Sequence, residues 1–309
     1  MGKYVGKRLL SLIPILLGIT FLTFLLLYIA PGDPAQKKLT AQGIAVTQEQ
    51  IDNTREEMGL NEPFLIQYGK WLGRAMTGDF GTSYKDNMTV TSKLGPAFQR
   101  TLVLACSSLL IALLVSIPTG ILSAVYKGSF WDHLFRLLSF IGNSLPNFLI
   151  SILLMYFLCI KVDLFPVIAS GSVQGLLLPT LALAIPMASR FVRQIRAEVL
   201  EEIGHDYVTG LAARGVKSSW ILFRNVLRNS MSSILTIIGL AIGGLMGGSV
   251  VVETIFNWPG VGKLAMDSIT ARDYPVIQGF VLIMAFVYVL VNLLTDLCHH
   301  WLDPRVELE

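Results

Sequence analysis

The segment HDYVTGLAARGVKSSWILFRNVLRNS, residues 205–230, lies between two apolar runs that are each long enough to cross a membrane. The segment itself is basic, and its apolar residues recur at helical spacing in two groups on either side of Gly215. The pattern predicts a short helix, a glycine turn and a second amphipathic helix. Such helices either lie on anionic lipid or dock into a groove of a cytoplasmic partner. The two groups are Tyr207, Val208 and Leu211, and then Trp220, Phe223 and Leu227.

The composition is typical of an integral membrane protein. Of the 309 residues, 53% are hydrophobic and 15% are charged, whereas charged residues make up about a quarter of a soluble domain. Apolar runs of about 20 residues, the length of a spanning helix, occur six times. We expect an all-α membrane protein with one transmembrane domain over residues 1–309. The six expected spans are residues 9–30, 102–126, 134–160, 176–196, 234–256 and 276–298.

Two of these spans leave alternatives open. The first run follows Lys3, Lys7 and Arg8 and could be a signal peptide, but its apolar part is too long and lacks a small-x-small cleavage site, which favours an uncleaved helix. The fourth is interrupted by Pro179 and Pro186.

Lysine and arginine in short loops predict the orientation. They gather before the first run and in the loops after the second and fourth runs, so both termini and residues 204–230 are expected in the cytoplasm. Residues 31–100 then lie outside. This long segment carries eight basic and eight acidic residues, and it predicts a folded cap. Within the cap, Thr47 and Gln50 have the spacing of a helix capping box, and Gly59 and Pro63 predict a break before a second helix.

No residue pattern predicts catalysis or a metal site in this chain. The segment NWPGVGKL, residues 257–264, lacks the first glycine and the final serine or threonine of a nucleotide-binding phosphate loop. The histidines have no i,i+4 pair, the cysteines have no CxxC spacing, and the cores of the spans contain no charge that would mark an ion path. We expect no catalytic residue and no cofactor in this chain, and an energy source elsewhere.

Polar and small residues inside two spans are candidates for a translocation pathway. Asn143, Ser144, Pro146 and Asn147 put polar groups and a kink inside the third run, as a pathway lining or as a purely structural kink. In the fifth run, glycines at i, i+4 and i+8 permit close helix approach, either within this chain or against a partner. These glycines are Gly239, Gly243 and Gly247. A row of arginines, Arg190, Arg193 and Arg196, is expected to anchor at lipid headgroups.

Residues 210–230 resemble the cytoplasmic EAA loop of ABC-importer permeases, with Gly215 at its glycine and Leu227 at its later leucine. Thr209-Gly210-Leu211 replaces the usual Glu-Ala-Ala, and Arg228 replaces proline, as in the peptide/nickel subfamily. Further matches to that subfamily follow in order along nearly the whole chain. They are Gly32-Asp33-Pro34, residues 78–83, 144–148, 253–262 and 272–278, and Leu302-Asp303-Pro304-Arg305.

The resemblance implies a type I importer architecture in a bacterial or archaeal cell membrane. Such a permease pairs with a homologous second permease and with two ATPase subunits that hold ATP and magnesium. An extracytoplasmic solute-binding protein delivers the cargo, and no nucleic acid is involved. Residues 204–230 would be the coupling segment that the ATPases push. The residues implied in coupling are Asp206, Tyr207, Leu211, Arg214, Gly215, Trp220, Phe223, Leu227 and Arg228.

The cargo is less defined by the sequence. Members of the subfamily move di- and oligopeptides, nickel or metal chelates. The short loop after the third run and the compact length favour nickel or a metal chelate over peptides. A stand-alone secondary transporter remains an alternative, although no inverted repeat is visible. A membrane receptor or assembly scaffold is a third possibility.

Overall fold

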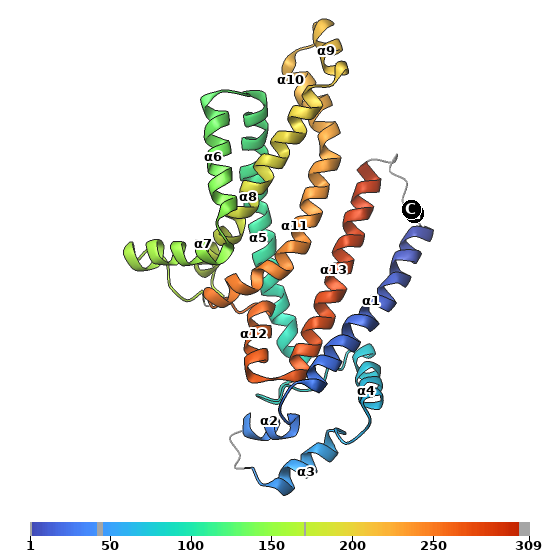
Figure 1. Cartoon of the computed structure of the whole chain (residues 1–309). Helices are drawn as coiled ribbons and strands as arrows, with labels where there is room; N and C mark the ends of the chain where they lie inside the picture. Colours follow the sequence, from blue (N-terminus) through green and yellow to red (C-terminus); the bar gives the residue numbers. More distant parts are fainter. Residues whose placement is uncertain (1, 42–45, 170, 303–309) are drawn as a thin grey trace. The chain divides into compact units, whose positions relative to one another are not determined.

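A computed structural model describes residues 2–41, 46–169 and 171–302 (Figure 1). Within these ranges the regular structure is helical, apart from one isolated β-bridge between Thr82 and Thr89. Five helices are long and apolar enough to cross a membrane, and a bent helix pair brings the number to six if it counts as one span. The all-α membrane fold is therefore confirmed. The final motif that begins at Leu302 runs into residues 303–305, outside the described part of the chain.

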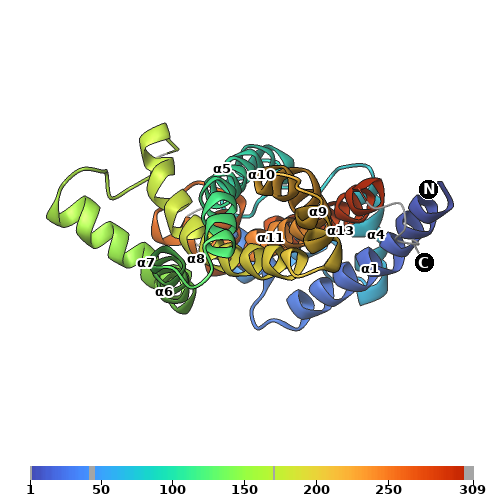
Figure 2. The ribbon, with the colours of Figure 1, turned by 90° about the horizontal axis from the view of Figure 1, so that it is seen from above.

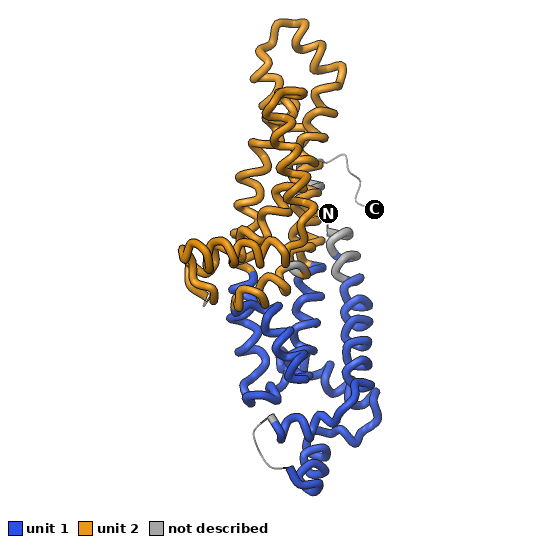
Figure 3. Tube along the Cα trace, turned by 60° about the vertical axis from the view of Figure 1, so that its left-hand side comes forward, with its two compact units in different colours: residues 1–101, 259–289 blue, residues 102–258, 290–309 orange. Residues whose placement is uncertain are grey.

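The chain divides into two compact units, coloured separately in Figure 3. The first unit consists of residues 1–101 and 259–289, and the second of residues 102–258 and 290–309. Two helices, α5 (Val90–Val125) and α13 (Tyr274–Leu302), contribute residues to both units. The other helices of the first unit are α1 (Gly2–Ile29), α2 (Pro34–Ala41), α3 (Gln48–Glu57), α4 (Phe64–Met76) and α12 (Val261–Ala271).

The segment between α1 and α5 is a folded cap, as expected. Thr47 accepts a hydrogen bond from the Gln50 amide, and the Gln50 side chain accepts one from the Thr47 amide, which completes the capping box of α3. Gly59, with φ +67°, follows α3 and allows the break before α4. Aromatic side chains of α4 pack on those of α1 with ring centroids 5.1–6.0 Å apart. The cap is thus attached to the first helix by an aromatic cluster.

A buried carboxylate joins distant segments of the first unit. The Asp273 side chain is 2% exposed and accepts hydrogen bonds from the Ser83 hydroxyl at 2.5 Å and from the Tyr84 amide at 2.9 Å. The preceding residue, Arg272, has a left-handed backbone with φ +54° and donates to the Pro31 carbonyl. Two of the subfamily-like motifs, residues 78–83 and 272–278, are therefore brought together.

The second unit is a bundle around α8 (Val173–Ile203). Helices α6 (Phe130–Ser144) and α7 (Asn147–Leu154) pack against α8, and so does α11 (Leu227–Ile255), as Figures 1 and 2 show. Its core includes the fully buried Phe191, Ile195 and Val199 of α8. Pro179 and Pro186 lie inside α8 without ending it, so the fourth expected span is longer than its apolar run.

The third expected span is not a kinked helix. Helix α6 ends at Ser144, Leu145 is extended, and Pro146 precedes α7, whose axis makes an angle of 100° with that of α6. Proline has no N–H to continue the ladder, and it pushes the preceding residue out of the helical region. Helix α7 then continues as the π-helical segment η1 (Met155–Lys161).

The fifth span begins much earlier than its apolar run suggests. Helix α10 (Ser218–Ile221) passes through the π-helical segment η2 (Leu222–Val226) directly into α11. The second amphipathic helix expected after Gly215 is therefore not a separate surface helix but the first turns of the span. With Arg228 in place of proline, no helix breaker separates the two.

Candidate functional site

The segment after α8 forms the expected helix, glycine turn and helix. Helix α9 (Asp206–Ala213) begins after His205, which directly follows the Gly204 cap of α8. Gly215 has φ +79°, a left-handed conformation that costs a residue with a Cβ about 1–2 kcal/mol. A Cβ at Gly215 would meet no atom within 4 Å, so the backbone angle alone requires glycine there.

A polar cluster fixes α9 to the ends of α8 and α11. The Glu202 Oε1 atom accepts hydrogen bonds from the Tyr207 hydroxyl at 2.6 Å and from the side-chain amide nitrogen of Asn229 at 2.8 Å. The His205 ring stacks on the Tyr207 ring. Sequence reasoning singled out Tyr207 but missed Glu202 and Asn229, because residues 202, 207 and 229 have no common helical spacing. The cluster sets the direction in which α9 leaves α8.

The Tyr207 phenol remains a hydrogen-bond donor over the whole physiological pH range. Burial, together with the hydrogen bond to the Glu202 carboxylate, raises the pKa of Tyr207 to about 12. The negative carboxylate also disfavours a negative phenolate beside it, which keeps the phenol protonated. Tyr207 thus keeps the proton that it donates to Glu202 at physiological pH.

One side of the segment faces the core of the second unit. Ile221 and Val226 are buried, and Leu211 packs on the core of the second unit. Val208 does the same from the neighbouring turn of α9. Leu211 therefore anchors α9, whereas the charged Asp206 and Arg214 at its two ends are exposed.

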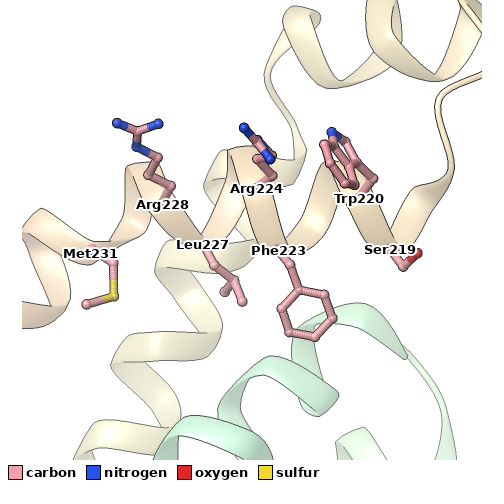
Figure 4. A pocket seen from close by; sticks show the side chains of 7 residues that line it. All are labelled: Ser219, Trp220, Phe223, Arg224, Leu227, Arg228 and Met231. Atoms are coloured by element: carbon pink, nitrogen blue, oxygen red, sulfur yellow. The ribbon is translucent and has the colours of Figure 1, made fainter.

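The other side is an open face of aromatic and basic side chains (Figure 4). Trp220 and Phe223 are 55% and 69% exposed, and the Arg224 guanidinium lies 4.8 Å from the centre of the Trp220 ring. All described residues that line this groove come from one continuous helix, so the described part of the chain supplies one of its walls. Such a face can fill a groove of a partner. The lining residues are Ser219, Trp220, Phe223, Arg224, Leu227, Arg228 and Met231.

The candidate pathway residues lie around the break between α6 and α7 and on α11. Asn143 and Asn147 are partly buried on either side of the break, and the Ser144 hydroxyl donates to the Phe140 carbonyl. Pro146 itself is exposed. Helix α7 packs against both α8 and α11, the helix that carries Gly243 and Gly247. Their role in a pathway stays a prediction.

The glycines of α11 do not share one environment. A Cβ at Gly239 would collide with Thr295 of α13, so this glycine allows close packing within the chain. A Cβ at Gly247 would meet no atom within 4 Å. Gly243 is half-buried. The helical stripe therefore combines internal packing at one end with an open face at the other.

The arginine row of α8 also divides. Arg196 does not reach for headgroups but binds Asp132, with Nε 2.7 Å from Oδ1 and Nη2 2.9 Å from Oδ2. The Ser123 hydroxyl and the Gly128 amide complete the shell of the carboxylate, which is 1% exposed. Arg190 and Arg193 are exposed, and their place at lipid headgroups stays a prediction. Among the described residues, no group of three or more His, Cys, Asp or Glu side chains could hold a metal ion.

Comparison with known proteins places both parts of the sequence in one transport family. Residues 116–308 match the family described as binding-protein-dependent transport system inner membrane component, and residues 1–105 match the N-terminal region of such membrane components. The chain is 38% identical over 307 residues to the metal-staphylopine import system permease protein CntB of Staphylococcus aureus, covering 99% of this chain and 98% of CntB. It is 39% identical over 321 residues to the oligopeptide transport system permease protein AppB of Bacillus subtilis, covering 99% and 100%.

A glutathione transport system permease protein, GsiC of Salmonella paratyphi A, is 37% identical over 306 residues, with 99% of both chains covered. The fold is similar to a chain of the inward-facing MetNI methionine ABC transporter, with a TM-score of 0.58 at 16% identity, over 69% of this chain and 97% of that one. The apolar helices, the motifs along the chain and these matches agree. The protein belongs to the family of binding-protein-dependent transport system inner membrane components and is a permease subunit of an ABC importer, with multiple spans in the cell membrane.

Proposed function

We propose that this permease forms half of the translocation pathway for a metal chelate, with nickel as the first metal to test, delivered by a solute-binding protein. The observation that carries the cargo is the 38% identity to a permease named for metal-staphylopine import, over nearly the whole of both chains. Peptides are the second candidate, because the oligopeptide permease AppB is similar to the same degree. Both cargoes are small solutes that present several polar groups at once.

The proposed partners are a homologous second permease and two ATPase subunits. The one-walled groove around Trp220 and Phe223 supports a cytoplasmic partner, since its aromatic rings are exposed and the described residues supply no second wall. Helix α9, held by the Glu202 cluster, is the proposed contact that the ATPases push when they close around ATP. Because a short turn joins α9 to α10, and α10 continues through η2 into α11, displacement of α9 acts on the start of a span. Nucleotide then biases one arrangement of the helices over another.

The cargo test is uptake by the complete complex in proteoliposomes, with its binding protein and ATP. Radiolabelled nickel alone, the same nickel with a chelator, and a labelled dipeptide are offered in parallel. We expect uptake of the chelated nickel. Uptake of the dipeptide alone would overturn the proposed cargo and leave the architecture intact.

The coupling test compares two substitutions at Gly215 in the same assay. Gly215→Val adds a β-branched residue at φ +79°, whereas Gly215→Asn adds a side chain of similar size that tolerates this angle. We expect the valine variant to lose most ATP-dependent uptake and the asparagine variant to keep most of it. Equal uptake by the two variants would show that the glycine turn does not matter for coupling.

A further inference from the structure

A second groove lies between α6 and α8, which run side by side in Figures 1 and 2. This α6–α8 groove has a volume of about 510 Å³ and takes its lining from both helices. It is separate from the face around Trp220. The lining residues are His133, Arg136, Leu137 and Phe140 of α6, and Arg193 and Arg196 of α8.

The groove carries positive charge that the rest of the described chain does not neutralise. Arg196 is paired with the buried Asp132. Arg136 and Arg193 are exposed, and neither forms a salt bridge with a described acidic side chain. The planar guanidinium binds phosphate oxygens through two parallel hydrogen bonds. Two such groups, one from each helix, suit a phosphate placed between the helices.

The opposite end of the groove is apolar. Leu137 and Phe140 are 57% and 64% exposed, and Phe140 lies about 6 Å along the helix axis from Arg136. Leu138 and Ile141 extend this apolar surface along α6, which belongs to a candidate membrane span. A ligand that fits both ends has a phosphate head and a hydrocarbon tail.

The surroundings place the basic end at a membrane surface. It lies near the start of α6, next to the exposed Trp131, and aromatic residues of this kind gather where a span leaves the lipid. The positive-inside rule assigns this end of α6 to the cytoplasm. Basic pockets between spans on that side of the membrane suit anionic lipid headgroups.

We propose that the α6–α8 groove binds an anionic phospholipid of the cytoplasmic leaflet. The phosphate lies between Arg136 and Arg193, and one acyl chain runs along Leu137 and Phe140. The bound lipid joins α6 to α8 beside the Asp132 ion pair, on the helix that leads into α9. This site is independent of the cargo, so its test does not depend on the proposed function.

The test is lipid binding by the purified complete complex, followed by native mass spectrometry in a neutral detergent. Phosphatidylglycerol is titrated against phosphatidylcholine, and inorganic phosphate is added as a competitor. The double variant Arg136→Gln/Arg193→Gln removes the two free guanidiniums of the groove. Its matched control, Lys127→Gln/Lys217→Gln, removes two exposed cations that do not line it. A third variant, Phe140→Ser, tests the apolar end.

We expect the parent complex to prefer phosphatidylglycerol, and the groove variant to bind it at least about tenfold more weakly. The control should stay within about twofold, and Phe140→Ser should weaken lipid binding while inorganic phosphate competes poorly. Equal weakening in both double variants would overturn the proposal in favour of diffuse surface charge. Strong competition by inorganic phosphate would make the groove a site for a soluble anion. Loss of a protein subunit in the groove variant, with lipid binding kept, would make it a protein interface.

Discussion

Replacing Asp132 with asparagine is expected to destabilise the protein by about 3–5 kcal/mol, the typical result of breaking a buried ion pair. The carboxylate is 1% exposed, and each of its oxygens accepts one bond from Arg196. Oδ1 also accepts from the Ser123 hydroxyl and Oδ2 from the Gly128 amide. In asparagine, one of these two oxygens is replaced by an NH2 group. Because an NH2 group cannot accept a hydrogen bond from the guanidinium, one charged hydrogen bond worth about 1.5–3 kcal/mol is lost in either orientation of the amide. Arg196, 18% exposed, is also left without its counter-charge.

The assay is unfolding of the purified permease by denaturant in detergent, monitored by circular dichroism. Glu62→Gln is the matched control, because it neutralises one partner of an exposed pair with Lys70 and should cost less than about 1 kcal/mol. The double variant Asp132→Leu/Arg196→Met, which removes both charges, should recover much of the stability lost in Asp132→Asn. The reasoning fails if Asp132→Asn is within about 1 kcal/mol of the parent, or if the double variant is no more stable than the single one.

Three further predictions concern other parts of the chain. Because the pKa of Tyr207 is raised to about 12, the stability that its hydrogen bond contributes should be lost only as the pH rises from about 10 to about 12. Ultraviolet difference spectra between the parent and Tyr207→Phe should show this one tyrosine ionising at the upper end of that range. Ionisation of Tyr207 near pH 10 would contradict the prediction. Gly239→Val should lower the unfolding temperature of the permease, because its side chain meets Thr295, whereas Gly247→Val should leave the isolated chain unchanged; equal shifts in the two variants would contradict the difference between the two environments. Asp273→Ala should increase proteolysis around residues 81–89, because the Ser83 hydroxyl and the Tyr84 backbone amide lose their acceptor. An unchanged digestion pattern would show that Asp273 does not hold this segment in place.

The elements that depend on local sequence were predictable. Long apolar runs, the capping box of Thr47 and the turn at Gly215 each follow from a few neighbouring residues, and the structure confirms all of them. Long-range pairs were not predictable in this way. Asp132 and Arg196 are 64 residues apart, and only the packing of α6 on α8 brings them together. The arginine was therefore expected at the membrane surface, although it is the partner of a buried carboxylate.

The break at Pro146 lies between these two cases. A proline predicts that a helix is disturbed, but the size of the disturbance depends on what the following segment packs against. Here α7 packs against α8 and α11, and the chain bends by 100° between α6 and α7. Helix α12 was missed for a related reason, because its 11 residues are too few and too mixed in polarity to form a spanning run.

The helix that begins at Ser218 continues through η2 into α11, which gives it the length of a lever. Its first 28 residues, Ser218–Leu245, extend for about 42 Å at the rise of an α-helix. A rotation of about 10° about one end therefore carries the other end sideways by about 7 Å. No helix end lies between Trp220 and the glycines of α11, which the chain reaches through η2. In the coupling role proposed above, a small push on the exposed aromatic face would therefore arrive at the glycines of α11 as a larger displacement.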